Sequence, residues 1–211
     1  MKLSRRKFFI FGSSAGIGAT GAAAGADKLI PTPKQTEGPF YPIVAQKDKD
    51  FDLTKVEGKD GVAKGNQVHI VGTVVDTDGK PIEDATVDLW QANAAGRYAH
   101  PNDKNPAPLD ENFQGWAIVP SGKDGGFKFK TIVPGAYPVS KKWSRPPHIH
   151  FKVSKKGYVE VTTQMYFPDE KLNEKDRLLN RHSKEEQAVM IAHKDEKAAD
   201  TLHYQIVLEK A

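Results

Sequence analysis

Short runs in which apolar and polar side chains alternate recur from residue 67 onward, and they constrain the fold more than any other feature of the sequence. Successive side chains of a β-strand point to opposite faces, so alternation predicts strands with one buried face. The expected strands are 67–75, 85–91, 127–130, 148–153, 161–167 and 204–208. Many short strands at close spacing are typical of an all-β sandwich or barrel.

The segments between these runs are rich in turn-forming residues. The longest are 93–112 and 134–147, and we expect both to be loops. Helical periodicity is scarce, and the best candidate is 183–192, where Ser183 and Glu186 have the spacing of a capping box. The predicted fold class is therefore an all-β sandwich with long loops and at most one or two short helices.

The first 26 residues have the features of an export signal. Arg5 and Arg6 form a twin-arginine pair ahead of two phenylalanines, and a mildly apolar, Gly/Ala-rich stretch leads to small residues at 24–26. This segment resembles a Tat signal, which implies passage through the twin-arginine translocon and a periplasmic location. Its many small residues make it a poor membrane span, so we expect no stable membrane anchor. An uncleaved anchor or a disordered tail is the alternative.

The net charge of +4 comes from this segment. The chain has 31 Lys and Arg against 27 Asp and Glu, and residues 1–26 hold four of the basic side chains and none of the acidic ones. Removing the segment leaves 27 of each sign, which argues against a nucleic-acid partner. The absence of cysteine excludes disulfides, thiolate-bound zinc or iron–sulfur sites and a thiol nucleophile.

At 211 residues, the chain has the length of one domain with a tail. We expect three parts: a Tat-type signal peptide at 1–26, an extended N-terminal arm at 27–64, and a β-sandwich domain at 65–211. The arm is rich in Pro, Gly and charged residues, which favour extended and turn conformations.

The segment 145–153 carries the most informative chemistry. His148 and His150 share one face of the expected strand, and the apolar side chains between and after them face the other way. Two imidazoles on one face form half of a metal site. A cupin would need a glutamate at Val153 or Ser154, so the remaining candidate ligands are carboxylates, other histidines and tyrosine phenolates. Surface or core histidines without a metal are the alternative.

Gly-Ala-Tyr-Pro at 135–138, paired with Arg-Pro-Pro-His-Ile-His at 145–150, is a specific combination. Further segments that match the same family are 35–39, 72–76, 79–81, 88–98, 100–103, 109–113, 131–134 and 163–167. In this order the segments resemble the intradiol ring-cleavage dioxygenases, and most closely the iron-carrying subunits of the protocatechuate 3,4-dioxygenase branch. The resemblance implies a prealbumin-like β-sandwich core.

The resemblance also implies one non-haem Fe(III) per chain, held by Tyr98, Tyr137, His148 and His150. Anionic phenolate oxygens suit this hard, highly charged ion. Two phenolates and one hydroxide would neutralise its charge, which limits the cost of burying the centre in a pocket. Taken singly, each tyrosine is also explained as an aromatic side chain packed in a loop or a turn.

The substrates that the resemblance implies are a catechol-type aromatic diol and O₂, with a cis,cis-muconate-type diacid as product. Tyr137 would serve as a base for a substrate proton, and Arg145 would stabilise negative charge on the activated ring. Trp90 and Gln164 would line the substrate pocket. The alternatives are a surface salt bridge for Arg145, a core position for Trp90 and a strand amide for Gln164.

Val139 departs from the family pattern, because close relatives often carry a tryptophan two residues after the second tyrosine ligand. Trp143 lies nearby in the sequence. Relatives that act on protocatechuate contact its carboxylate with a partner subunit. The resemblance therefore leaves open the ring substituent and whether the chain forms a homo-oligomer or needs a partner subunit.

Two other classes of function also stay open. Transthyretin-like binding modules without a metal share the strand-and-turn motif at 72–87. A periplasmic copper or zinc carrier would use His148 and His150 with either His69 or His100. The four nitrogen and oxygen donors argue against the metal-free binding module. Colour discriminates among all three classes, since ferric tyrosinate would give a red-brown protein.

Overall fold

The computed structural model describes residues 28–44, 46 and 48–211. The expected signal peptide, with its twin-arginine pair and its cleavage site, lies outside the described residues. Within the described part, no helix has the length and apolar character needed to cross a membrane.

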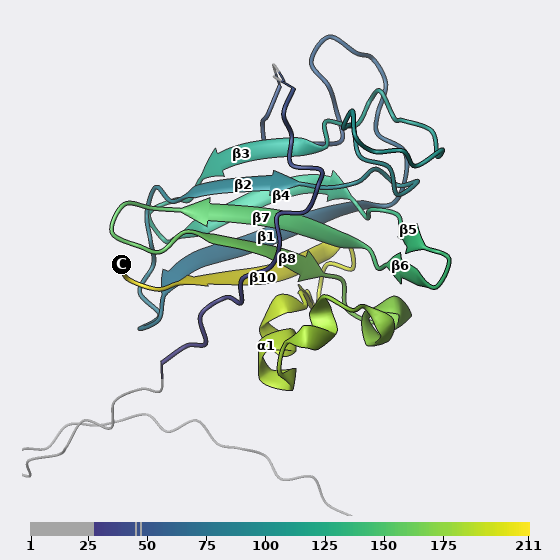
Figure 1. Ribbon diagram of the computed structural model, residues 1–211. Helices are drawn as coiled ribbons and strands as arrows, with labels where there is room; N and C mark the ends of the chain where they lie inside the picture. The colour runs from purple at the N-terminus through teal and green to yellow at the C-terminus, as the bar shows by residue number, and fades with distance from the viewer. Residues whose placement is uncertain (1–27, 45, 47) are drawn as a thin grey trace, which may run out of the picture.

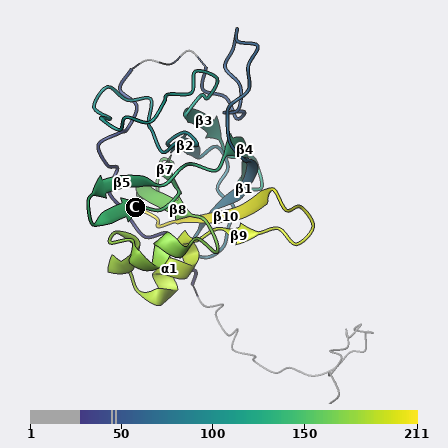
Figure 2. The ribbon, with the colours of Figure 1, turned by 90° about the vertical axis from the view of Figure 1, so that its right-hand side faces the viewer.

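Two four-stranded sheets pack face to face (Figure 1), and the turned view of Figure 2 separates them into two layers. The first sheet has the order β4–β1–β10–β9 and the second the order β3–β2–β7–β8. β1 pairs in parallel with β10, and the other neighbours in both sheets are antiparallel. The strand bounds are β1 Gln67–Asp76, β2 Thr86–Trp90, β3 Trp116–Pro120, β4 Gly126–Ile132, β7 His148–Ser154, β8 Val161–Tyr166, β9 His193–Lys194 and β10 Thr201–Leu208.

These sheets confirm the predicted β-sandwich. The six expected strands correspond to β1, β2, β4, β7, β8 and β10. The expected capping box is present at the start of α1 (Lys184–Met190), where Ser183 and Glu186 each accept a hydrogen bond from the other's backbone N–H. Two 3₁₀-helices, η1 (Lys171–Lys175) and η2 (Leu179–Arg181), precede it.

The expectation that 134–147 is a loop was wrong. This segment contains a hairpin of β5 (Tyr137–Ser140) and β6 (Trp143–Arg145). Most of its side chains are exposed or only partly buried, so no alternating apolar face marks the two strands in the sequence. The short strands β3 and β9 were not predicted either, whereas 93–112 has no helix or strand, as expected.

Alternation along the strands decides which side chains form the core. On β7, Ile149, Phe151 and Val153 are fully buried between the two sheets. Phe151 meets the rings of Phe127 and Phe129 of β4 with centroids 6.0 and 6.3 Å apart. Because one strand face fills the core, the other face of β7 is left for the outer side of the second sheet.

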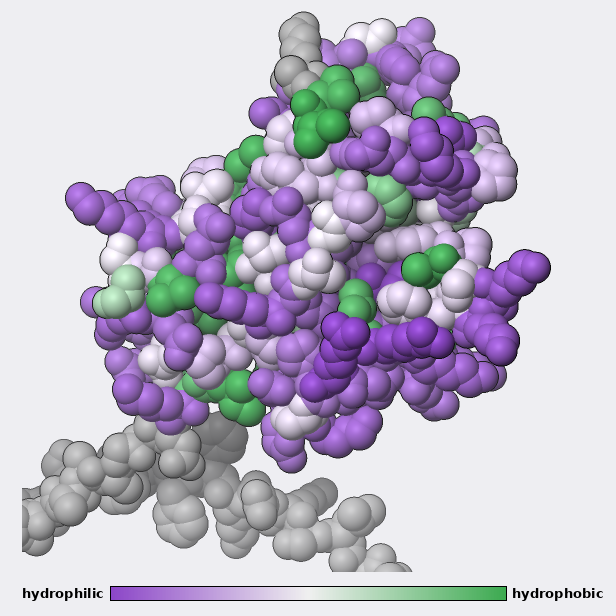
Figure 3. Space-filling view, in the orientation of Figure 1, coloured by the Kyte–Doolittle hydropathy of each residue, from purple (hydrophilic) through white to green (hydrophobic). Residues whose placement is uncertain are grey.

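The N-terminal arm runs over that outer side. The described residues of 28–64 form no helix and no named strand. The backbone N–H of Thr32 donates to Val207 O (3.0 Å) and that of Gln35 to Thr162 O (2.8 Å). From there the arm crosses β8 and β7 toward β2 (Figure 1). This face of the molecule is mostly hydrophilic, with apolar side chains scattered in small groups (Figure 3).

Candidate active site

The outer face of the second sheet forms the floor of the site. Strand pairing places Trp90, His150 and Gln164 in one row across β2, β7 and β8. His148 stands opposite Tyr166 in the next row. All five side chains are buried, although they lie outside the sandwich core, because the arm and the loops cover them.

Two loops bring Tyr98 and Tyr137 over this floor. Tyr98 follows β2, and Tyr137 begins β5. The loops touch backbone to backbone at Gly96 and Gly135, where a Cβ on either glycine would lie 2.5–2.6 Å from a carbonyl oxygen of the other loop. The N–H of Gly135 donates to Asn93 O (2.9 Å) and fixes this approach. Only glycines allow the two tyrosine loops to meet this closely.

Three of the four expected ligands meet at His148 Nε2, and the ring of His150 lies beside them. Tyr98 Oη lies 3.4 Å from His148 Nε2, and Tyr137 Oη lies 3.5 Å from the same nitrogen. The ring centroids of the two tyrosines are 5.8 Å apart, and those of His148 and His150 are 5.1 Å apart. Two tyrosines from separate segments therefore lie against a histidine pair of β7 in one buried cluster.

The two histidines are held in different ways. His148 Nδ1 donates to the carbonyl of Pro146 (2.6 Å), which leaves the lone pair of Nε2 directed at the tyrosine oxygens. His150 stacks on Trp90 with centroids 4.8 Å apart and an interplanar angle of 13°. Its buried Nδ1 has no hydrogen-bond partner within the described part of the chain. An unpaired buried ring nitrogen needs an explanation, and a bound ion is one that suits the phenol and imidazole groups beside it.

Burial keeps these groups neutral in the metal-free protein. It raises the pKa of Tyr98, with help from Tyr137, well above the ordinary value, and it raises the pKa of Tyr137. Burial and then the positive charge of Arg145 lower the pKa of His148 strongly and that of His150 to about 3. The imidazoles thus keep free lone pairs at neutral pH, and a bound cation would favour loss of the phenol protons.

Arg145 is buried next to this centre. Its Nε donates to Asp176 (2.8 Å), and its Nη2 donates to Gln164 Oε1 (2.5 Å) and to Tyr166 Oη (3.1 Å). Burial alone would lower the pKa of Arg145, but Tyr166 and Asp176 raise it above its ordinary value. The guanidinium is charged and inside the site, so the alternative of a surface salt bridge does not hold.

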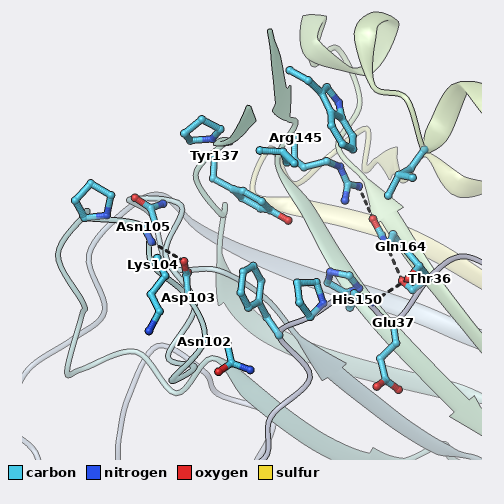
Figure 4. A pocket seen from close by; sticks show the side chains of 18 residues that line it. Thr36, Glu37, Asn102, Asp103, Lys104, Asn105, Tyr137, Arg145, His150 and Gln164 are labelled. Atoms are coloured by element: carbon cyan, nitrogen blue, oxygen red, sulfur yellow. Dashed lines mark hydrogen bonds between the residues drawn. The ribbon is translucent and has the colours of Figure 1, made fainter. Parts of the chain in front are cut away.

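A cavity of about 610 Å³ opens above the floor. Tyr137, Arg145, His150 and Gln164 point into it from β5, β6, β7 and β8 (Figure 4). Val139, where the sequence departs from the family pattern, lines this cavity. Trp143, on the other strand of the hairpin, lines it as well. Trp90 instead lies behind His150 and lines a separate cavity of about 260 Å³.

The structure does not join other histidines to this pair. His69 lies on β1, in the other sheet, and His100 lies on a loop where its Nδ1 accepts from the N–H of Asn102 (3.1 Å). Among the described residues, no three or more His, Asp or Glu side chains are placed together to hold a metal ion. In the described part of the chain, the side-chain oxygens that meet His148 Nε2 are those of Tyr98 and Tyr137.

Sequence reasoning missed Tyr166 and Asp176. Tyr166 lies two residues after Gln164 on the same strand, so the strand period alone places both on one face. Asp176 follows η1, where no periodicity marks it, and only the folded chain brings it to Arg145.

Comparison with known proteins identifies the family of this chain. A family model described as "Dioxygenase" matches residues 36–210. The chain belongs to the intradiol ring-cleavage dioxygenase family.

Two curated members of the family show how far the likeness extends. The protocatechuate 3,4-dioxygenase beta chain of Burkholderia cepacia is 40% identical over 151 residues, which cover 68% of this chain and 64% of that one. Catechol 1,2-dioxygenase of Acinetobacter baylyi is 30% identical over 161 residues, which cover 70% and 49%. This chain therefore spans less than two thirds of the length of these intradiol dioxygenases.

Solved structures share the fold. The dioxygenase domain of a dioxygenase–carbohydrate-binding protein fusion from Streptomyces sp. SirexAA-E superposes with a TM-score of 0.64 at 28% identity, over 86% of this chain and all of that one. 3-Chlorocatechol 1,2-dioxygenase from Rhodococcus opacus 1CP gives 0.67 at 24% identity, over 85% and 72%. The second likeness shows the fold alone.

The intradiol dioxygenase family uses a non-haem ferric ion. The donors found here suit that ion, since they are two phenol oxygens, one imidazole nitrogen with a free lone pair facing them, and a second buried imidazole with an unpaired nitrogen. With no cysteine in the chain, a softer thiolate site is excluded. The residues present fit the group.

Proposed function

We propose that this chain cleaves a catechol-type aromatic diol between its two hydroxyl-bearing carbons, adding both atoms of O₂ to give a cis,cis-muconate-type diacid. Tyr98, Tyr137, His148 and His150 would hold one ferric ion. The observation that carries this proposal is the convergence of both tyrosine oxygens on His148 Nε2, at 3.4 and 3.5 Å, beside a cavity. The ferric ion would bind the diol oxygens and activate the ring toward O₂.

Tyr137 is the tyrosine suited to move a proton. It lines the cavity, whereas Tyr98 is almost fully buried behind it. A phenolate at Tyr137 Oη can accept a proton from a catechol hydroxyl that enters the cavity. Tyr98 would stay in place as a ligand, held by its backbone N–H, which donates to Asp103 (2.8 Å).

Arg145 would stabilise negative charge on the ring. Its Nη1 has no hydrogen-bond partner among the described residues, while Nε and Nη2 are both engaged. A buried guanidinium that is held in place stabilises developing charge without reorganising during the reaction. Both polar atoms of the Gln164 amide are hydrogen-bonded: Oε1 accepts from Arg145, and Nε2 donates to Thr36 O. Gln164 would therefore orient Arg145 and pack against the substrate. Trp90 would orient His150 by stacking.

Oxygen uptake and product analysis test the proposed function. Iron-loaded protein is given catechol, protocatechuate and a chlorocatechol, and we expect one O₂ consumed per diol and a muconate-type absorbance for at least one of them. The matched control is Tyr158→Phe, a partly buried tyrosine outside the site. Iron-loaded protein that cleaves none of these diols, or cleaves outside the hydroxyl-bearing carbons, would contradict the proposal.

We also propose export by the twin-arginine route and assembly with a further subunit. The first rests on the sequence of residues 1–26, and the second on the name of the B. cepacia relative, which is a beta chain. Replacing Arg5 and Arg6 by lysine should keep the protein out of the periplasmic fraction. Light scattering on the purified chain measures its oligomeric state. A monomer would agree with the need for a further subunit, and a stable homo-oligomer would argue against it.

A further inference from the structure

The N-terminal arm is attached to the outer sheet face by side chains from three strands. Gln35 and Thr36 bind to β8, where Tyr166 Oη donates to Gln35 Oε1 (3.0 Å) and Gln164 Nε2 donates to Thr36 O (3.1 Å). Lys152 of β7 pairs with Glu37, and Asp88 of β2 accepts from Tyr41 Oη (2.7 Å). The first two attachments involve the residues that also bind Arg145.

Tyr166 lies at the junction of the arm and the guanidinium. Its fully buried hydroxyl accepts from Arg145 Nη2 at 3.1 Å and has its nearest acceptor in Gln35 Oε1, at 3.0 Å. Two other acceptors, on Gln164 and Asp176, are farther away, at 3.4 Å each. A phenol has one proton to give and can accept at the same time, so this hydroxyl can link one donor to one acceptor.

We propose that Tyr166 is a positioning residue that couples the arm to Arg145. Through its hydroxyl, docking of the arm at Gln35 holds the guanidinium against the cavity, and the guanidinium in turn holds the arm closed. Residues 36–40 of the arm line the cavity, so the same bond controls how well the cavity is covered. The kinetic consequence rests on the proposed function, whereas the structural coupling does not.

The kinetic test is a double-mutant cycle on iron-loaded protein. Tyr166→Phe keeps the ring and should keep iron content, visible colour and the Kd for a catechol, but lower kcat about ten- to hundredfold, since a misplaced charged group loses that order of rate. In an Arg145→Lys background, the same change should cost less than about threefold, because Tyr166 acts through Arg145. Tyr158→Phe, a partly buried tyrosine with no contact to this network among the described residues, should leave kcat unchanged.

The structural test uses the metal-free full-length protein and hydrogen–deuterium exchange. Amides of residues 35–41 should exchange about five- to tenfold faster in Tyr166→Phe and in Arg145→Lys than in Tyr158→Phe, as expected for the loss of one net hydrogen bond. Hydrogen–deuterium exchange can be measured even if the protein cleaves no catechol. A failure of the proposed function can therefore be told apart from a failure of the coupling.

Unchanged exchange in both variants would overturn the coupling. So would a wild-type kcat in iron-loaded Tyr166→Phe, or an equal loss of kcat with and without Arg145, which would make Tyr166 an independent contributor. If the wild-type protein binds iron and cleaves no diol, faster exchange of the arm in both variants supports the coupling and only the proposed function falls.

Discussion

Gly96 is the residue on which the meeting of the two tyrosines most depends. Its φ is +77°, in the left-handed region that glycine favours, and a Cβ there would lie 2.6 Å from the carbonyl oxygen of Ala136. The backbone of the Tyr98 loop therefore approaches the Tyr137 loop at a point where no side chain fits.

We predict that Gly96→Ala destabilises the protein by about 2–4 kcal/mol, from strain and overpacking together, and lowers its iron content. The matched control is Gly58→Ala, because Gly58 has a similar φ of +81° but no other atom within 4 Å of the point where a Cβ would lie. It should cost only about 1 kcal/mol and keep the iron. Denaturant unfolding and metal analysis measure both, and equal iron content in the two variants would contradict the prediction.

Asp176 is the only carboxylate that pairs with Arg145 in the described part of the chain, and its side chain is fully buried. We predict that Asp176→Asn lowers the free energy of unfolding by about 3 kcal/mol, because it leaves a buried guanidinium without its counter-charge. Asp169→Asn removes an exposed pair with Lys194 and should change stability by less than about 1 kcal/mol. Similar losses for the two variants, measured by denaturant unfolding, would show that burial of the pair is unimportant.

At the level of strands and loops, alternation in the sequence was enough to predict the faces of β7. The same rule put Ile149, Phe151 and Val153 in the core and both histidines outside it. Strand spacing paired His148 with His150, whereas Tyr98 and Tyr137 were identified from a family resemblance. Their meeting with the histidines could not be derived from spacing, because Tyr98 lies on an irregular loop and Tyr137 begins the short hairpin strand β5.

The hairpin β5–β6 and the path of the arm could not be predicted either. The hairpin is short and largely exposed, so its sequence lacks a buried face. The arm is held by a few isolated backbone bonds and by single side-chain bonds from three strands, such as Tyr41 to Asp88, and no periodic pattern encodes such contacts.

The attachment of the arm to β2 gives a prediction at this level. Tyr41→Phe should lower the free energy of unfolding by about 1–2 kcal/mol, since Asp88 is buried and would keep only the donor from Trp116. Tyr158→Phe, whose hydroxyl has no hydrogen bond among the described residues, should be close to neutral. Equal effects of the two changes in denaturant unfolding would mean that the bond to Asp88 does not stabilise the arm.

The stability of the whole metal-free molecule should depend on pH through the buried histidines. The folded pKa of His150 is about 3, below its ordinary value of 6.5, and that of His148 is lowered as well. Between pH 6.5 and about 3, the unfolded chain binds more protons than the folded one, so stability is full above 6.5 and falls as the pH is lowered.

We therefore predict that His150→Gln flattens the fall of unfolding free energy between about pH 6.5 and about pH 4.5, measured by denaturant unfolding of metal-free protein. The exposed His193→Gln should keep the wild-type slope. Parallel curves for His150→Gln and wild type would show that protonation of His150 does not destabilise the folded protein.

The central claim, a ferric ion held by two tyrosines and two histidines, is tested most directly by the visible absorption spectrum of the intact purified protein. We predict a red-brown protein with one iron per chain and a tyrosinate-to-iron charge-transfer band. The band should shift or vanish in Tyr137→Phe and on chelation, and should persist in Tyr158→Phe. A folded protein that stays colourless when supplied with iron, or a band that Tyr137→Phe leaves unchanged, would contradict the account.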